Sequence, residues 1–203
     1  STVNRSEFNG YGINTRLFIQ RGFGDNFPLE SMLYSAGANP EELMSNEFTR
    51  SSGFIPNDWV GYGNGSGTFH MGGGLNLRGF SGYYMNEPTD NGTQNTYKGT
   101  SGLAFNTEID FTEKFDKLEY FGLNTYLFAD IGVINENKIG DKLAFSRPNF
   151  DLGLGFTCEL SRLWDHVLDG EPVTLRFDFP IYVNHTPSDE SSVKLRCLFG
   201  FNR

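Results

Sequence analysis

Apolar and polar residues alternate one by one along several segments of this chain. In the segment Asn149–Leu160, every even position is apolar and every odd position is polar or small. A period of two is the period of a β-strand that has one apolar face and one polar face. Such a strand lies between core and water in a soluble protein, or between lipid and a wet lumen in a membrane barrel.

The same alternation predicts five further strands. They are Ile13–Phe23, Gly102–Phe111, Leu123–Val133, Val173–Phe179 and Val193–Asn202. Their apolar faces are rich in Leu and Phe, whereas the opposite faces mix Gly, Asn, Asp, Glu and Arg in a way that suits a water-filled lumen. The predicted fold class is therefore all-β, an antiparallel transmembrane β-barrel. A soluble β-sandwich, which also alternates, is the alternative interpretation.

The connections between these strands are very unequal in length. Residues 1–24 would hold the first barrel strand and its lead-in, and residues 102–203 the last five strands. Between them, residues 25–101 would form a long extracellular loop that can fold back into the lumen, far longer than ordinary connections. Known membrane barrels start at eight strands, and an open edge in lipid leaves backbone groups unpaired. The six strands are thus expected to be part of a larger barrel, completed by the same polypeptide or by others.

Composition and charge narrow the possible functions. The chain has 25 Gly and 20 Phe among 203 residues, and a net charge of −9 that argues against nucleic-acid binding. No apolar run approaches the length of a transmembrane helix. The three histidines lie in separate loops without a His-Glu-x-x-His motif, so we expect no metal and no cofactor. No nucleophile or general base stands out, and we do not expect the chain itself to be an enzyme.

A series of motifs runs in order along residues 68–203. They are GGGLNLRGF at Gly72–Phe80, FNTEID with Glu108, FADIG with Asp130, DLGLGF at 151–156, RFDFP at Arg176–Pro180 and the terminal LFGFNR. In order and spacing they resemble the barrel superfamily of outer-membrane assembly insertases. This surface-antigen superfamily includes Bam-type and Tam-type insertases, plastid Toc-type relatives and two-partner secretion transporters. The resemblance implies a sixteen-stranded barrel, of which ten strands would lie outside this chain.

The resemblance also implies a function for the loop tip. Arg78, with Gly79 and Phe80, would enter the lumen and bind Glu108 and Asp130, which by alternation lie on the lumen face of their strands. A guanidinium fork matches carboxylates in a bidentate geometry. We call these five residues the loop-lock residues. The simpler alternative is that Arg78 lies in a solvated turn and that the two acids merely line a wet channel.

The family function would be the insertion or translocation of proteins at the bacterial outer membrane. The expected partners are outer-membrane lipid, client outer-membrane proteins and accessory subunits of an assembly or secretion complex, with no nucleic acid. The last strand would form half of the seam at which the barrel closes, with Val193, Leu195, Cys197, Phe199 and Phe201 on its apolar face. Unlike the usual family pattern, in which the last residue is aromatic, Phe201 is followed by Asn202 and Arg203.

Two other functions stay open at this point. Pro28–Pro56, which contains the stretch Asn46–Gly53, resembles the loop of barrel-tailed proteins of the Bacteroidota that carry a zinc-metallopeptidase domain. In that case the barrel would be a passive membrane anchor for an N-terminal catalytic domain. The second alternative is a soluble β-sandwich that acts as an interaction module.

Overall fold

The computed structural model describes twelve parts of the chain, namely residues 2–8, 10–23, 32–36, 74–80, 86–89, 92–95, 98–111, 122–135, 145–159, 174–184, 193 and 198–202. The strands are β1 (Thr2–Phe8), β2 (Tyr11–Arg21), β3 (Leu33–Tyr34), β4 (Asn86–Thr89), β5 (Gly92–Asn95), β6 (Lys98–Gly99), β7 (Ser101–Asp110), β8 (Leu123–Ile134), β9 (Asn149–Glu159), β10 (Thr174–Val183) and β11 (Leu198–Asn202). A single 3-10 turn, η3 (Arg78–Phe80), is the one helical element in these ranges. No helix among the described residues is long and apolar enough to cross a membrane.

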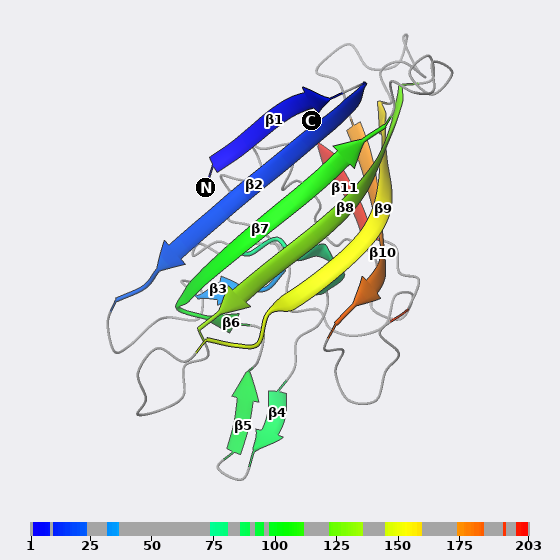
Figure 1. The fold of residues 1–203 in the computed structure, drawn as a ribbon. Coiled ribbons are helices and arrows are strands. Elements are labelled where there is room, and N and C mark those ends of the chain that lie inside the picture. Colours follow the sequence, from blue (N-terminus) through cyan, green and yellow to red (C-terminus); the bar gives the residue numbers. More distant parts are fainter. Residues whose placement is uncertain are drawn as a thin grey trace.

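Seven of the strands form one antiparallel sheet in the order β1-β2-β7-β8-β9-β10-β11. The strands therefore follow one another across the sheet as they do along the chain, and the long segment between β2 and β7 is an insertion between two neighbours. Figure 1 shows that the sheet curls, so that β10 and β11 lie behind β7, β8 and β9. The prediction of an all-β antiparallel fold is confirmed.

All six predicted strands are present, as β2 and β7 to β11, with ends that differ by a few residues. The last strand is described only from Leu198, whereas the alternation predicted it from Val193. Val193 instead forms an isolated bridge with Tyr182 of β10. The predicted seam residues Leu195 and Cys197 lie outside the described residues.

The first strand, β1, was not predicted, and residues 1–24 hold two strands rather than one. Its sequence TVNRSEF has too few apolar residues to show a period of two. It forms because it pairs with β2 as a hairpin, with Phe8 opposite Tyr11. The connection Asn9-Gly10 is the dipeptide that favours a tight hairpin turn, and Gly10 has a φ of 77°. That dipeptide is the sequence signal for β1, because alternation alone does not reveal this strand.

The sheet has its apolar face on the outside. The outward apolar side chains of β2, β7, β8 and β9 include nine that are 39–66% exposed; they are Leu17, Ile19, Leu103, Phe105, Ile109, Leu127, Ile131, Leu152 and Leu154. The inward positions of the same strands and of β10 hold buried polar residues; they are Arg16, Asn106, Glu108, Asp130, Asp151, Arg176 and Asp178. This is the reverse of the arrangement in a soluble β-sandwich, whose apolar faces form the core.

Parts of the long insertion lie against the inward face. The strand β3 pairs with β6 on one side, and Tyr34 forms a parallel bridge with Gly74 on the other. The main-chain N–H groups of Leu75 and Leu77 donate to the carbonyls of Tyr34 and Ser35, both at 2.9 Å. The segments 33–36, 74–77 and 98–99 are therefore joined by backbone pairing into one small unit.

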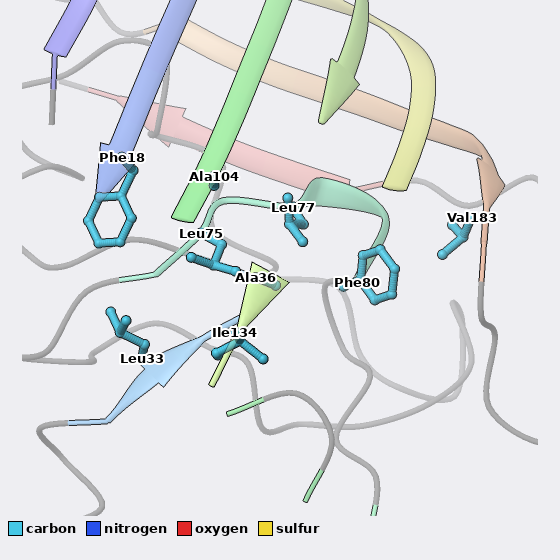
Figure 2. Packing of buried hydrophobic residues seen from close by; sticks show 9 residues of the cluster. All are labelled: Phe18, Leu33, Ala36, Leu75, Leu77, Phe80, Ala104, Ile134 and Val183. Carbon is cyan, nitrogen blue, oxygen red and sulfur yellow. The ribbon is translucent and has the colours of Figure 1, made fainter. Parts of the chain in front are cut away.

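An apolar cluster attaches this unit to the sheet. Figure 2 shows its nine residues, which are Phe18, Leu33, Ala36, Leu75, Leu77, Phe80, Ala104, Ile134 and Val183. Five of them come from the insertion, and the other four come from β2, β7, β8 and β10. Burial of these side chains holds the insertion against the sheet, at about 25 cal/mol for each Å² of apolar surface removed from water.

Candidate functional site on the inward face of the sheet

The turn η3 carries Arg78 to the inward face. The N–H of Phe80 donates to the carbonyl of Leu77 at 3.0 Å, which closes the 3-10 turn. Phe80 and Leu77 both belong to the apolar cluster, so the residues on either side of Arg78 and Gly79 are anchored by burial. A Cβ atom on Gly79 would collide with the side chains of Asp151 and Val183, so only glycine allows the turn to approach β9 and β10 this closely.

Arg78 binds Asp130 of β8 with a bidentate fork. Its Nε donates to Oδ2 of Asp130 at 2.8 Å and its Nη2 donates to Oδ1 at 2.8 Å. The main-chain N–H of Arg78 adds a third hydrogen bond to Oδ2, at 3.1 Å. Paired N–H donors that meet both carboxylate oxygens combine charge with a fixed orientation. The guanidinium is therefore held in position as well as neutralised.

The same guanidinium reaches two further strands. Its Nη1 donates to Oε1 of Glu108 on β7 at 2.5 Å, and it lies 3.6 Å from Oδ1 of Asp178 on β10. Arg176 of β10 also donates to Oε1 of Glu108. Glu108 is thus shared by two arginines, one from the loop tip and one from the sheet.

Arg176 is itself oriented by its own strand and by β8. Its Nε donates to Oδ2 of Asp178 at 3.0 Å. The hydroxyl of Tyr126 donates to Oδ1 of Asp178 at 2.8 Å. Because Arg176 and Asp178 are two residues apart on one strand, their side chains share the inward face.

Aromatic rings on β8 provide flat surfaces for both arginines. The Arg78 guanidinium lies 3.9 Å from the centroid of the Phe128 ring, and that of Arg176 lies 4.6 Å from the centroid of the Tyr126 ring. A cation over an aromatic face is attracted by the ring quadrupole. These contacts therefore add to the ion pairs.

Two glycines of the DLGLGF segment make room for these rings. In the register of β8 and β9, Phe128 lies opposite Gly153 and Tyr126 lies opposite Gly155. A Cβ atom on Gly153 would collide with the Phe128 ring, and one on Gly155 would collide with the Tyr126 ring. The glycine-rich pattern of β9 is explained by this close packing across the two strands.

The buried charges on the inward face do not balance. The described residues include three buried arginines, Arg16, Arg78 and Arg176, and four buried carboxylates, Glu108, Asp130, Asp151 and Asp178. Asp151, which is 0% exposed, interacts with the main-chain N–H of Gly79 and with the carboxyl group of Asp130. Asp151 also lies directly opposite Asp130 in the register of β8 and β9. The arrangement thus places a fourth carboxyl group, that of Asp151, directly beside the residue that holds Arg78.

Arg78 remains charged in this environment. Burial lowers the pKa of its guanidinium, but the carboxylates of Asp130 and Glu108 raise it by more, so the pKa lies above its ordinary value. Deprotonation of the arginine is therefore no route by which the loop tip could be released.

The structure brings together all five loop-lock residues. Arg78 contacts both predicted carboxylates, Gly79 lies against β9 and β10, and Phe80 is buried in the apolar cluster. The predicted seam residues are placed only in part. Phe199 and Phe201 lie on β11, which pairs with β10 and has no second neighbour among the described strands. Val193 is 62% exposed.

Six further residues of the site were not given a role by the sequence. They are Arg16, Asn106, Tyr126, Asp151, Arg176 and Asp178, all on inward faces. Alternation places each of them on the polar face of its strand. The available sequence signal was therefore that the charged residues of several strands lie on the same side of the sheet. What was missing was the curvature that brings β7 and β10 within reach of each other.

The arrangement holds the loop tip against three strands through buried ion pairs. In the described ranges, no three His, Cys, Asp or Glu side chains are grouped so that they could hold a metal ion. Comparison of the chain with protein-family models, with curated proteins and with solved structures gave no match.

Proposed function

We propose that this chain is part of an outer-membrane β-barrel of the assembly-insertase superfamily, and that it acts in the insertion or translocation of proteins at the outer membrane. The observation that carries the proposal is the sheet with an apolar outside and a charged inside, to which a loop is attached through Arg78. Two parts of the proposal, the membrane and the loop, have separate physical support.

Support for the membrane comes from the outward side chains. Leu103, Phe105, Leu127, Ile131 and Leu152 belong to three neighbouring strands and are 40–50% exposed. Soluble monomeric proteins rarely expose continuous apolar patches larger than a few hundred Å². A soluble β-sandwich would have to bury this face, yet the buried face is the one that carries the arginines and carboxylates. The proposal therefore places the outward face in lipid.

Support for a barrel comes from contacts across the inward face. Glu108 on β7 and Arg176 on β10 are separated by two strands, which in a flat sheet would put their backbones about 14 Å apart. Their side chains nevertheless meet, and Arg78 contacts β7, β8 and β10 together. Such contacts favour a concave sheet, as a segment of a closed barrel would be. A total of sixteen strands belongs to the proposal through the family resemblance.

The loop and the edge strand suggest how the protein would act. A loop that is held on the inner side by buried ion pairs can control access to the lumen of a barrel. An edge strand can pair with a strand of a client protein by strand addition. We propose β11 as half of that seam. The anchor for a metallopeptidase domain rests on residues 28–56, of which only residues 32–36 are described, and no geometry there favours it.

The direct test is the assembly of client proteins. In cells that depend on the variant, Arg78→Ala is expected to lower the amounts of other folded outer-membrane β-barrel proteins several-fold, because the loop tip loses its partners. Arg78→Lys should have a smaller effect, since one ammonium group cannot reproduce the bidentate fork. The exposed Arg147 supplies a control variant, Arg147→Ala, which should change nothing.

The measurement compares folded client proteins by quantitative immunoblotting of outer membranes. Unchanged client amounts, with the Arg78→Ala protein itself present at the normal level, would contradict a function in insertion. That outcome would favour the passive anchor instead.

A further inference from the structure

Arg16 reaches from β2 to the backbone of the loop. Its side chain is 0% exposed. Its Nη2 donates to the carbonyl oxygen of Gly74 at 3.2 Å, and its Nη1 lies 3.4 Å from the carbonyl oxygen of Leu75. Nη1 also donates to Oδ1 of Asn106 on β7 at 2.9 Å. These are neutral acceptors, in contrast to the carboxylates that bind Arg78.

Asn106 extends this contact further along the loop. Its Nδ2 lies 3.0 Å from the carbonyl oxygen of Asn76 and 3.2 Å from that of Leu75. It also lies 3.1 Å from Oδ1 of Asp130. Because a guanidinium can only donate hydrogen bonds, the amide oxygen of Asn106 must point toward Arg16. Arg16 therefore turns the Asn106 NH₂ group toward the loop and toward Asp130.

The loop backbone is shaped for this contact. Successive carbonyls point in opposite directions along an extended chain, so a single side chain cannot normally bind two in a row. Asn76 has a φ of 54°, in the left-handed region that Asn tolerates better than most residues. This local conformation allows the carbonyls of Leu75 and Asn76 to face the same amide group.

We propose that Arg16 and Asn106 form a second attachment point, which positions residues 74–77 by binding their backbone and keeps them docked when the Arg78 tip is disengaged. The loop then has a stem, residues 74–77, held by hydrogen bonds and apolar burial, and a tip, residues 78–80, held by the ion pairs of Arg78 and the burial of Phe80. Release at Arg78 is a movement of the tip about a stem that stays in place. This inference rests on the proposed role of the loop and adds the residues that position it.

Opening of the stem can be measured at Ser35, which is 1% exposed. The carbonyl of Ser35 accepts a hydrogen bond from the N–H of Leu77 in the stem. A cysteine at position 35 should react with a water-soluble maleimide only when the stem opens. The probe is Ser35→Cys in the native protein with Cys158→Ala and Cys197→Ala. Arg16→Gln is expected to raise the labelling rate about tenfold, because buried hydrogen bonds from a charged donor are lost. Arg78→Ala should change it by less than about twofold, because the hydrogen bonds from Arg16 and Asn106 to the stem backbone remain.

Matched variants separate this effect from general loss of structure. Arg21→Gln removes an exposed arginine from the same strand and should leave the labelling rate unchanged. If Arg16→Gln does not fold, Arg16→Lys replaces it. Lys keeps the charge but lacks the planar fork whose two nitrogens reach Asn106 and the loop carbonyls, so labelling should still rise.

Two results would overturn the inference. One is a labelling rate that does not change in the Arg16 variant. The other is an equal rise in Arg16→Gln and Arg78→Ala, which would show that stem and tip open as a single unit. Labelling needs no client protein. The labelling experiment can therefore confirm the stem even if client assembly does not depend on Arg78. That combination of results would reject the proposed function and leave the attachment through Arg16 and Asn106 in place.

Discussion

Replacing Arg78 with alanine is expected to lower the free energy of unfolding by about 3–5 kcal/mol, the usual result of removing one partner from a buried ion pair. Asp130 and Glu108 are 0% and 5% exposed, and both would lose a charged donor. Equilibrium unfolding in urea, in the membrane mimic that supports the folded protein, measures this change. The free energy of unfolding of Arg78→Lys should lie between those of Arg78→Ala and the wild type.

The size of this effect distinguishes the buried ion pairs from a solvated turn. An arginine in water contributes between 0 and 1 kcal/mol through a surface ion pair. A loss below about 0.5 kcal/mol in Arg78→Ala would therefore contradict the buried contact. The same experiment with Arg147→Ala, in which the replaced arginine is exposed, gives the reference for a solvated side chain.

Two aspartates that face each other should respond in opposite directions to the same change. Asp130→Asn is expected to destabilise the protein by about 3 kcal/mol, because Asp130 accepts bonds from the side chain and main chain of Arg78 and from Asn106. Asp151→Asn should instead stabilise it by about 1 kcal/mol. Asp151 lies directly opposite Asp130, and like charges opposite each other on neighbouring strands are destabilising.

The same unfolding measurement compares the two variants, which have identical chemistry at adjacent positions of the sheet. If Asp151→Asn destabilises the protein as much as Asp130→Asn, then the contacts of the Asp151 carboxyl group outweigh its repulsion with Asp130, and the prediction is wrong. Asp151→Ala is a useful second variant, because it removes the carboxyl group without adding a donor.

The sequence was sufficient to place the residues around Arg78 on one face of the sheet. Strict alternation in β7 and β8 puts Glu108 and Asp130 on the inward side, and their cross-strand neighbours follow from the antiparallel order. The alternation also separates the exposed apolar positions from the buried polar ones. A period of two defines sides of a sheet, but it leaves open which side is buried; the burial of the charged face is the structural finding.

Other parts of the site could not be predicted from residue types. Arg16 binds backbone carbonyls, and every residue has such an acceptor, so the sequence gives no sign of which carbonyls it meets. The sharing of Glu108 by Arg78 and Arg176 depends on sheet curvature, which a one-dimensional pattern does not contain. The strand β1 was missed because an edge strand needs no regular apolar face when its pairing is set by a tight turn.

The most direct test of the account is the environment of the outward face of β8 in lipid bilayers. Nitroxide labels are attached one at a time at Thr125, Leu127, Ala129, Ile131 and Val133, and their collisions with oxygen and with a water-soluble nickel complex are measured. The account predicts high oxygen and low nickel accessibility, with the extreme near the middle of the strand, because oxygen concentrates in the bilayer core. High nickel accessibility at all five positions would place this face in water and would contradict the membrane barrel.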